Sequence, residues 1–344
     1  MQQYSFSMRR CSGPRHPWRA RWHQVLILAA LAAGLASPAG AAKYAAEFLR
    51  IGAGARALGM GAAVTAMIDD ASAVYWNPAA ITRVPGAEIQ LMHAEQFEDL
   101  ADYDYAAFVQ PLPDAGAIGV GLIRFSVSDI LITTDAYDDE NGNHQYDVGE
   151  RIDPSRFYFD SDTEYGLFFT FARPVADRLS FGGSLKVIRQ DLPGHTSFGL
   201  GADLGALWQP RVDLRLGARL SDATTTQLYW DSGRRETVTP TLSLGGALTR
   251  TLLAEALDVT LATDLVLYFD GRSTASQFEL GLPADLNAGL ETWFRRLFAA
   301  RIGWQESGVT AGAGFRVRGL GVDYAFVPHE ALGSSHRVSA SYAF

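Results

Sequence analysis

The chain has 344 residues, of which 38 are acidic and 29 basic, and its formal net charge is −9. This acidic balance argues against a nucleic-acid partner, which would need a basic patch. The single cysteine, Cys11, precedes the apolar part of an N-terminal leader, so a mature chain without that leader has neither disulfide nor thiol chemistry.

Residues 1–42 have the features of a cleaved secretory signal peptide. Five arginines and no carboxylate accompany an apolar run over 25–35 and a small-residue site over 39–41. The apolar run is roughly half of the ~20 residues that a membrane-spanning helix needs, so a retained anchor is the weaker alternative. We expect cleavage after Ala41 or Ala42, which leaves 24 basic against 38 acidic residues and a net charge of about −14.

Residues 43–86 show no alternation and are predicted to form a short N-terminal plug, or hatch. They are rich in glycine and other small residues, which let the backbone pack closely inside a narrow lumen. The stretch 52–57 matches a loose dinucleotide fingerprint, but the strand, the helix and the βαβ unit that such a site requires are missing around it. We expect Arg56, Asp69 and Asp70 to be neutralised instead by opposite charges on a surrounding wall.

The remainder of the chain, 87–344, alternates between apolar and polar residues. From Val212 to Leu220, for example, the even positions are apolar while the odd positions carry aspartate, arginine and glycine. A period of two over many segments predicts strands with one apolar and one polar face. The alternating segments are 87–95, 104–111, 115–126, 162–173, 178–190, 195–208, 212–220, 238–249, 257–268, 278–293, 297–305, 308–317, 319–327 and 336–344.

This pattern predicts an all-β fold, an antiparallel transmembrane β-barrel of about 14 strands in the outer membrane of a Gram-negative bacterium. An even strand number and alternating short and long connections are typical of such barrels, and closure is required because lipid cannot hydrogen-bond an open sheet edge. A large secreted β-sandwich also alternates, but it does not require unequal connections. The charged face would line the lumen, with Asp203, Asp213, Arg215, Arg219, Asp264, Arg301, Arg316 and Asp323.

The chain ends on Phe344, at the end of the alternating segment 336–344. A terminal aromatic residue in an amphipathic strand resembles the signal by which the barrel-assembly machinery recognises outer-membrane barrels. Together with the signal peptide, Phe344 therefore predicts outer-membrane localisation, with outer-membrane lipid against the apolar face.

The longest predicted connection, 127–161, is acidic, with nine carboxylates between Asp135 and Asp162. Its residues 139–150 place oxygen-bearing groups at the ligand positions of an EF-hand-type loop, so we expect a structural Ca²⁺ there, on the extracellular side. The turn glycine, Gly142, stands two positions early and no amphipathic helix flanks the loop, so a merely acidic, solvated loop is the alternative. The predicted ligands are Asp139, Asn141, Asn143, Gln145 through its carbonyl, Asp147 and Glu150.

The N-terminal segment carries three short blocks that resemble a known family. The blocks at 54–61 (GARALGMG), 69–71 (DDA) and 75–79 (YWNPA) resemble the PorV/PorQ family, relatives of the FadL fatty-acid transporters of the outer membrane. The tripeptide at 77–79 is similar to one in the FadL hatch, and the rest is closer to PorV. The residues that the resemblance singles out are Arg56, Gly59, Gly61, Asp69, Asp70, Trp76, Asn77 and Pro78.

The resemblance implies roles without enzymatic chemistry. PorV-like members receive or shuttle exported proteins in type IX secretion, so a component for protein export or surface assembly, with secreted proteins or secretion components as partners, is the main hypothesis. The alternative is a FadL-like transporter of small hydrophobic ligands, and the second alternative is a structural barrel without transport. The sequence contains neither a nucleophile-elbow motif nor a metal-type histidine pair, so we expect no enzyme.

Overall fold

The computed structural model describes residues 45–96, 100–134, 136–140, 142–143, 146–253, 255–270, 277–306, 308–328 and 333–344. The predicted signal peptide, 1–42, lies outside these ranges. No helix within them is long and apolar enough to cross a lipid bilayer.

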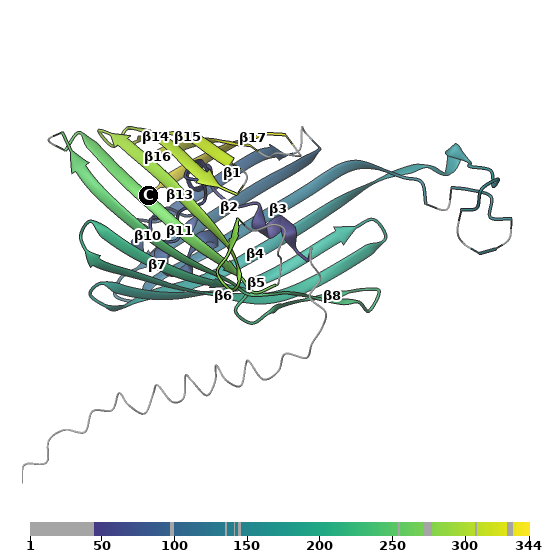
Figure 1. The fold of residues 1–344 in the computed structure, drawn as a ribbon, viewed down its shortest axis with the longest axis horizontal. Helices are drawn as coiled ribbons and strands as arrows, with labels where there is room; N and C mark the ends of the chain where they lie inside the picture. The colour runs from purple at the N-terminus through teal and green to yellow at the C-terminus, as the bar shows by residue number, and fades with distance from the viewer. Residues whose placement is uncertain are drawn as a thin grey trace, which may run out of the picture. The chain divides into compact units, whose positions relative to one another are not determined.

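Fourteen strands of the described chain close into an antiparallel barrel (Figure 1). Each strand pairs with the next barrel strand along the chain, and the ring closes where β1 pairs with β17, from Glu88 opposite Ala343 to Glu95 opposite His336. The barrel strands are β1 Glu88–Gln96, β2 Ala101–Leu112, β3 Gly116–Ile132, β4 Tyr158–Ala176, β5 Leu179–Leu192, β6 His195–Arg211, β7 Leu214–Ser221, β10 Thr241–Leu252, β11 Leu257–Tyr268, β13 Pro283–Phe294, β14 Phe298–Gln305, β15 Gly308–Val317, β16 Leu320–Val327 and β17 Ser335–Ala343.

Each of the fourteen predicted segments overlaps one of these strands, so the predicted fold class is confirmed. The clearest differences lie at β3 and β4, which run to Ile132 and from Tyr158, into the predicted connection 127–161. The register shifts between Val127 and Ile130. Because such a bulge interrupts the period of two, the alternation does not reveal that the strands continue. The connection beyond the strands is therefore shorter than expected.

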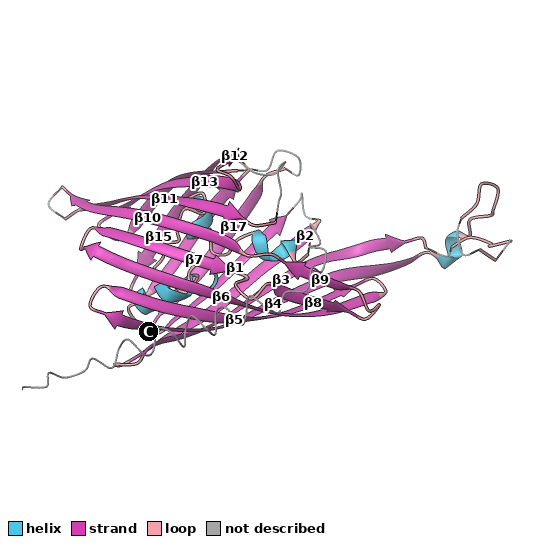
Figure 2. Cartoon of the chain, turned by 60° about the horizontal axis from the view of Figure 1, so that its bottom comes forward, coloured by secondary structure: helices cyan, strands magenta, loops and turns pink. Residues whose placement is uncertain are grey.

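Three short strands lie outside the ring: β8 Thr226–Trp230, β9 Arg235–Val238 and β12 Phe278–Glu279. β8 pairs with the first half of β6, with Ser197 opposite Trp230, while β7 pairs only from Leu204 onward (Figure 2). β9 pairs with β8, and β12 pairs with β13. Alternation does not predict this β8–β9 hairpin, because strands of five and four residues are too short to show a clear period of two.

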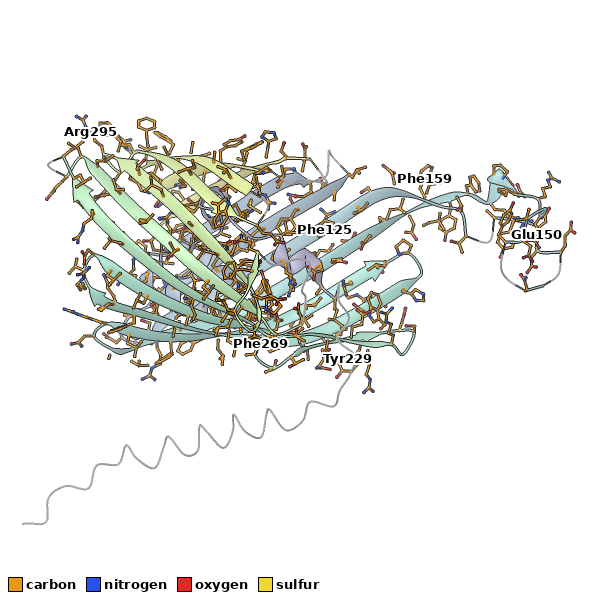
Figure 3. All side chains as sticks on the ribbon, viewed as in Figure 1. Phe125, Glu150, Phe159, Tyr229, Phe269 and Arg295 are labelled. Carbon is orange, nitrogen blue, oxygen red and sulfur yellow. The ribbon has the colours of Figure 1, made fainter. Side chains whose placement is uncertain are left out.

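β3 and β4 continue beyond their neighbours as a two-stranded ribbon, the β3–β4 extension, residues 127–162 (Figure 1). The connection at its end contains a single 3₁₀ turn, η3 Pro154–Arg156, and a bridge between Tyr137 and Ile152. Figure 3 shows Phe159 on the ribbon and Glu150 near its far end. The predicted calcium loop is thus carried away from the barrel wall.

The two faces of the wall have opposite character. In β1, the side chains of Glu88, Gln90 and Gln96 are buried, whereas those of Ile89 and Leu91 are exposed. Because successive side chains of a strand point to opposite faces, every barrel strand sends one set inward and the other outward. Apolar side chains are exposed in this way along the whole ring, including Phe108, Ile118, Phe171, Leu185, Leu204, Leu244, Leu261, Leu290, Ile302, Val322 and Val338.

The N-terminal segment, residues 45–86, is folded into four short helical turns (Figure 2, cyan). Helices this short are not stable by themselves, so contacts with the inner face of the wall must hold them in place. Most of the segment is buried: from Ala53 to Ile81, only Ala62, Asp69 and Trp76 are partly exposed. The turns are η1 Glu47–Arg50, α2 Ala55–Gly59, α3 Ala73–Trp76 and η2 Pro78–Arg83.

Candidate functional site in the barrel lumen

Arg56 lies at the centre of a buried ion cluster that joins the N-terminal segment to the wall. Its Nε and Nη2 donate to the two carboxylate oxygens of Glu291 on β13, both at 2.8 Å. Its Nη1 donates to Asp69 Oδ1 at 2.7 Å and to Asp70 Oδ2 at 3.1 Å. Because Glu291 also accepts from Arg301 Nε of β14 at 2.7 Å, one carboxylate links the segment to two wall strands.

Burial makes this cluster energetically important. Arg56 and Glu291 are 5% and 1% exposed, and removing one partner of a buried ion pair typically costs about 3–5 kcal/mol. Burial disfavours the charged guanidinium, yet the surrounding carboxylates raise the pKa of Arg56 well above its usual value. Burial would likewise raise the pKa of Asp69, but Arg56 and Arg215 hold it below its ordinary value. The charges of the segment are therefore compensated partly by the wall and partly within the segment.

Two polar side chains hold the irregular backbone of the segment. Asp264 Oδ2 on β11 accepts from the backbone nitrogens of Val64 and Thr65 at 2.9 and 2.8 Å. Asn77 Nδ2 donates to the carbonyl of Thr65 at 2.7 Å and to that of Ala206 on β6 at 3.3 Å. Since buried backbone groups outside regular structure need such partners, Asp264 and Asn77 position the turn between α2 and α3.

Glycines on the inner face of the wall make room for the segment. A Cβ atom at Gly182 on β5 would lie 2.5 Å from the carbonyl carbon of Pro78. Backbone atoms cannot yield to such a contact in the way that a flexible side chain can, so the wall needs glycine where the segment approaches. We call the wall glycines that contact the segment the glycine belt: Gly119, Gly121, Gly166, Gly182, Gly205, Gly217, Gly245, Gly289, Gly303 and Gly312.

The two motif glycines of the segment face this belt. Gly61 has a φ of 63°, and a Cβ atom there would lie 2.5 Å from the backbone nitrogen of Trp304 on β14. Gly59 would place a Cβ atom 3.1 Å from the Cα of Gly312 on β15. Gly61 thus satisfies two requirements at once, a left-handed backbone conformation and a close backbone approach.

A cavity of about 620 Å³ lies within the barrel, at the end where the long connections emerge. One side of it is apolar and comes mainly from the N-terminal segment, with Tyr75 and Trp76 beside Phe168 of β4. The ring of Tyr75 meets those of Trp76 and Phe168 edge-on, at centroid distances of 4.8 and 6.1 Å. Trp76 Nε1 and the Tyr75 hydroxyl donate to the carbonyls of Ala53 and Leu49, both at 2.6 Å, so their polar atoms are satisfied within the segment.

The cavity lining also contains charged residues, and Arg219 lies over the ring of Tyr75 at 5.2 Å from its centroid. Lys186 on β5 forms ion pairs with Asp203 at 2.8 Å and with Asp222, and Arg219 pairs with Asp203 at 3.0 Å. Arg337 on β17 also lines the cavity. A mostly apolar pocket with a few fixed polar groups is typical of small-molecule sites, whereas this cavity combines an apolar side with several charges.

Alternation placed most of the lumen charges correctly. Asp264, Arg301 and Asp323 are buried on the inner face. Asp213 instead lies at the turn after β6, where it pairs with Arg250, because the wall strand begins one residue later. Three further buried lumen residues are not among the predicted ones, although each occupies the same alternate positions as the other polar residues of its strand, which is the signal that identifies them: Lys186, Glu291 and Arg337.

The predicted calcium loop is only partly described. Asp139 Oδ1 accepts from the backbone nitrogens of Gly142 and Asn143 at 2.7 and 3.2 Å. Asn143 Nδ2 donates to Asp147 Oδ2 at 2.9 Å, and Glu150 Oε2 accepts from the Asp147 nitrogen at 2.9 Å. Within the described ranges no group of three or more His, Cys, Asp or Glu residues is arranged to hold a metal ion, so the calcium site stays a prediction. The predicted ligands outside those ranges are Asn141 and Gln145.

Phe344 follows the last residue of β17. Its backbone nitrogen donates to the carbonyl of Ala87 at 2.8 Å, and its ring meets that of Tyr342 edge-on at 4.8 Å. Its side chain is exposed, which leaves it accessible at the seam between the first and last strands. Its role in assembly stays a prediction.

Hydrocarbon transporters are among the solved structures that resemble this barrel. The toluene transporter TodX of Pseudomonas putida matches with a TM-score of 0.52 over 85% of this chain and 99% of that chain, at 13% identity. The toluene transporter TbuX of Ralstonia pickettii gives 0.50 over 85% and 98% at 13% identity, and the monoaromatic hydrocarbon channel CymD gives 0.51 over 86% and 98% at 14% identity. This chain has the barrel fold of these transporters. At such low identity the likeness concerns the fold alone.

A family model described as "Uncharacterised protein family (UPF0164)" matches residues 27–142, which include the N-terminal segment and the first three strands. No curated protein matches the sequence. The FadL-like part of the resemblance is therefore supported at the level of the fold, whereas the PorV/PorQ part stays a prediction.

Proposed function

We propose that this chain is an outer-membrane barrel that admits small, largely apolar molecules into its lumen from the end that bears the long connections. The observation that carries the proposal is the cavity of about 620 Å³, whose apolar side is formed by the N-terminal segment and Phe168. Its volume lies within the range of about 300–1,000 Å³ typical of small-molecule pockets. An apolar outer face around a polar lumen is also the distribution that a lipid-embedded barrel requires.

In this proposal the N-terminal segment acts as a plug that stays in place. Its removal would take Arg56 away from Glu291, and breaking a buried ion pair in this way is costly. The glycine belt supports the same reading, because it provides close backbone contact with the segment on many strands. Ligands would then move past the plug through rearranged side chains rather than through its withdrawal.

A role in protein export or surface assembly, the PorV-like hypothesis, is the second candidate. The observation that favours it is the β3–β4 extension, which carries Phe159 away from the barrel (Figure 3). Phe159 and its neighbour Tyr158 are 68% and 53% exposed. Exposed aromatic side chains are frequent anchors of protein–protein interfaces.

A structural Ca²⁺ in the connection at the end of the extension is proposed as an accessory feature. Asp139, Asn143, Asp147 and Glu150 would supply oxygen ligands, which are the donors that this ion prefers. The bound ion would offset the mutual repulsion of the carboxylates and part of the entropy lost when a long connection is ordered.

Uptake of radiolabelled toluene into cells that express the full chain would test the main proposal. We expect uptake above that of cells with an empty vector, and we expect Ser243→Trp, which fills the cavity from β10, to abolish it. Ser161→Trp, on the exposed extension, serves as the matched control and should transport normally. Uptake equal to the empty vector would overturn the proposal.

Mass spectrometry of the protein purified from its own membrane would then favour the second candidate if a secreted protein co-purified stoichiometrically.

A further inference from the structure

Arg337 differs from the other buried cations of the lumen. Four cationic side chains within the described ranges are this deeply buried, namely Arg56, Lys186, Arg301 and Arg337. The first three each contact a carboxylate at 2.8 Å or less. Arg337 is 4% exposed and forms no ion pair with a residue of the described chain. A buried charge without a countercharge is unfavourable, so its presence calls for a partner.

The hydrogen bonds of Arg337 leave part of its guanidinium unused. Nε donates to Ser335 Oγ at 3.3 Å, Nη1 to the carbonyl of Ile51 at 3.3 Å and Nη2 to Gln96 Oε1 at 3.4 Å. All three acceptors are neutral, and the bonds are long. Because a guanidinium has five N–H groups, one N–H on each terminal nitrogen has no acceptor among the described residues. Gln96 Nε2 nearby is also buried without a hydrogen-bond partner.

These groups belong to the same cavity as the aromatic side chains. Arg337, Gln96 and Ser335 are among the polar residues that line it. Ile51, whose carbonyl Arg337 contacts, lines the same cavity as Tyr75 and Trp76, so the cation and the aromatic rings belong to one lining. A molecule that fills this space would therefore have both a cation and aromatic rings among the groups around it.

We propose that the cavity takes a small carboxylic acid with an aromatic body, and that Arg337 holds its carboxylate. This inference rests on the proposed function and specifies its substrate class. Two parallel N–H groups match the geometry of a carboxylate, and such charge-assisted pairs are about twice as strong as neutral hydrogen bonds. The ring of the acid would pack against Tyr75 and Trp76, which favour edge-on and offset contacts. Arg337 would thus select an anion over a neutral hydrocarbon of the same shape.

Isothermal titration calorimetry on the full-length, detergent-solubilised barrel would test this inference with three probes of similar size: benzoate, its uncharged analogue benzamide, and toluene. We expect the wild-type protein to bind benzoate more tightly than benzamide. We expect Arg337→Gln to weaken benzoate binding by roughly tenfold or more, in line with the loss of a charge-assisted pair, without changing benzamide binding. The benzoate affinity of Arg337→Lys should lie between those of the wild type and Arg337→Gln, because lysine keeps the charge but lacks the planar fork of hydrogen-bond donors.

Arg316→Gln is the matched control, because it removes the same charge from an arginine that does not line the cavity, and it should bind benzoate as the wild type does. Equal benzoate affinity in wild type and Arg337→Gln would overturn the inference. Toluene binding in that same experiment would leave the proposed function standing, whereas the absence of binding by all three probes would overturn both. Heat-modifiable migration on gels reports whether each variant forms the folded barrel. If Arg337→Gln fails to fold, the ratio of benzoate to benzamide affinity in Arg337→Lys decides whether Arg337 holds the carboxylate.

Discussion

Arg56 and Glu291 form a two-point hydrogen-bonded pair, in which Nε and Nη2 each lie 2.8 Å from one carboxylate oxygen. The two residues are 235 positions apart in the sequence, one in α2 of the N-terminal segment and the other on β13 of the wall. Because both are buried and Glu291 is shared with Arg301, this pair fixes how the segment sits in the lumen.

Glu291→Gln should strongly destabilise the folded barrel. The change leaves Arg56 and Arg301 buried with one fewer negative charge between them, for which about 3–5 kcal/mol of unfolding free energy is a typical cost. Guanidinium-induced unfolding in detergent measures this difference. Arg296→Gln is the control, because Arg296 is 79% exposed in its pair with Asp258, and exposed pairs contribute less than about 1 kcal/mol. A Glu291→Gln loss as small as that of the control would show that the pair does not anchor the segment.

Gly61→Ala should displace the N-terminal segment from the wall. The new methyl group would lie 2.5 Å from the Trp304 backbone nitrogen in a residue whose φ is 63°. Faster proteolysis within the segment and a lower thermal midpoint are the expected results. Gly194→Ala separates the effect of the positive φ from that of the close contact, since Gly194 has a φ of 78° but nothing within 4 Å of an added Cβ. The loss of unfolding free energy in this control should stay near the ~1–2 kcal/mol cost of a left-handed residue. Equal effects of the two changes would rule out the close contact as the cause.

Stability should fall at low pH in part through Asp69. Burial is outweighed by Arg56 and Arg215, so the pKa of Asp69 in the folded state lies below its ordinary value of 3.8. A group with a depressed folded pKa stabilises the protein above its unfolded pKa, and this contribution is lost as the pH falls through the folded pKa. Unfolding midpoints measured from pH 6 downward should therefore depend less steeply on pH below 3.8 in Asp69→Asn than in the wild type. The same change at Asp177, in an exposed turn, should leave the wild-type profile intact; an Asp69→Asn profile that also matched the wild type would contradict the assignment.

Calcium should protect the connection at the end of the β3–β4 extension. We expect a dissociation constant of about 10⁻⁴ to 10⁻³ M, as in extracellular sites of this type, and slower tryptic cleavage at Arg151 and Arg156 when the ion is added. Glu150→Gln should remove this protection. Glu140→Gln changes a neighbouring carboxylate that is not a predicted ligand. This control variant should keep the protection by calcium. Identical cleavage with and without calcium in the wild type would refute the site.

The barrel strands were predictable because side-chain alternation is a local property of each strand. Asp264, Arg301 and Asp323 could be assigned to the lumen on parity alone. The same signal failed where local geometry breaks the period, at the bulge after Val127 and in the short β8–β9 hairpin. A family resemblance identifies the motif residues of the N-terminal segment, but it does not predict their contacts. A stretch without alternation carries no local signal for which wall residue each side chain will contact.

The sequence by itself determined which side of the wall each strand residue occupies, since that depends only on its immediate neighbours and on the contrast between an apolar and a polar face. Only the tertiary structure decided which charges are paired. Closure of the ring and the register of its strands place Glu291 against Arg56 and give Lys186 and Arg301 their carboxylates. The same closure brings Arg337 to the cavity without a carboxylate among the described residues, because distances across a lumen depend on all fourteen strands together.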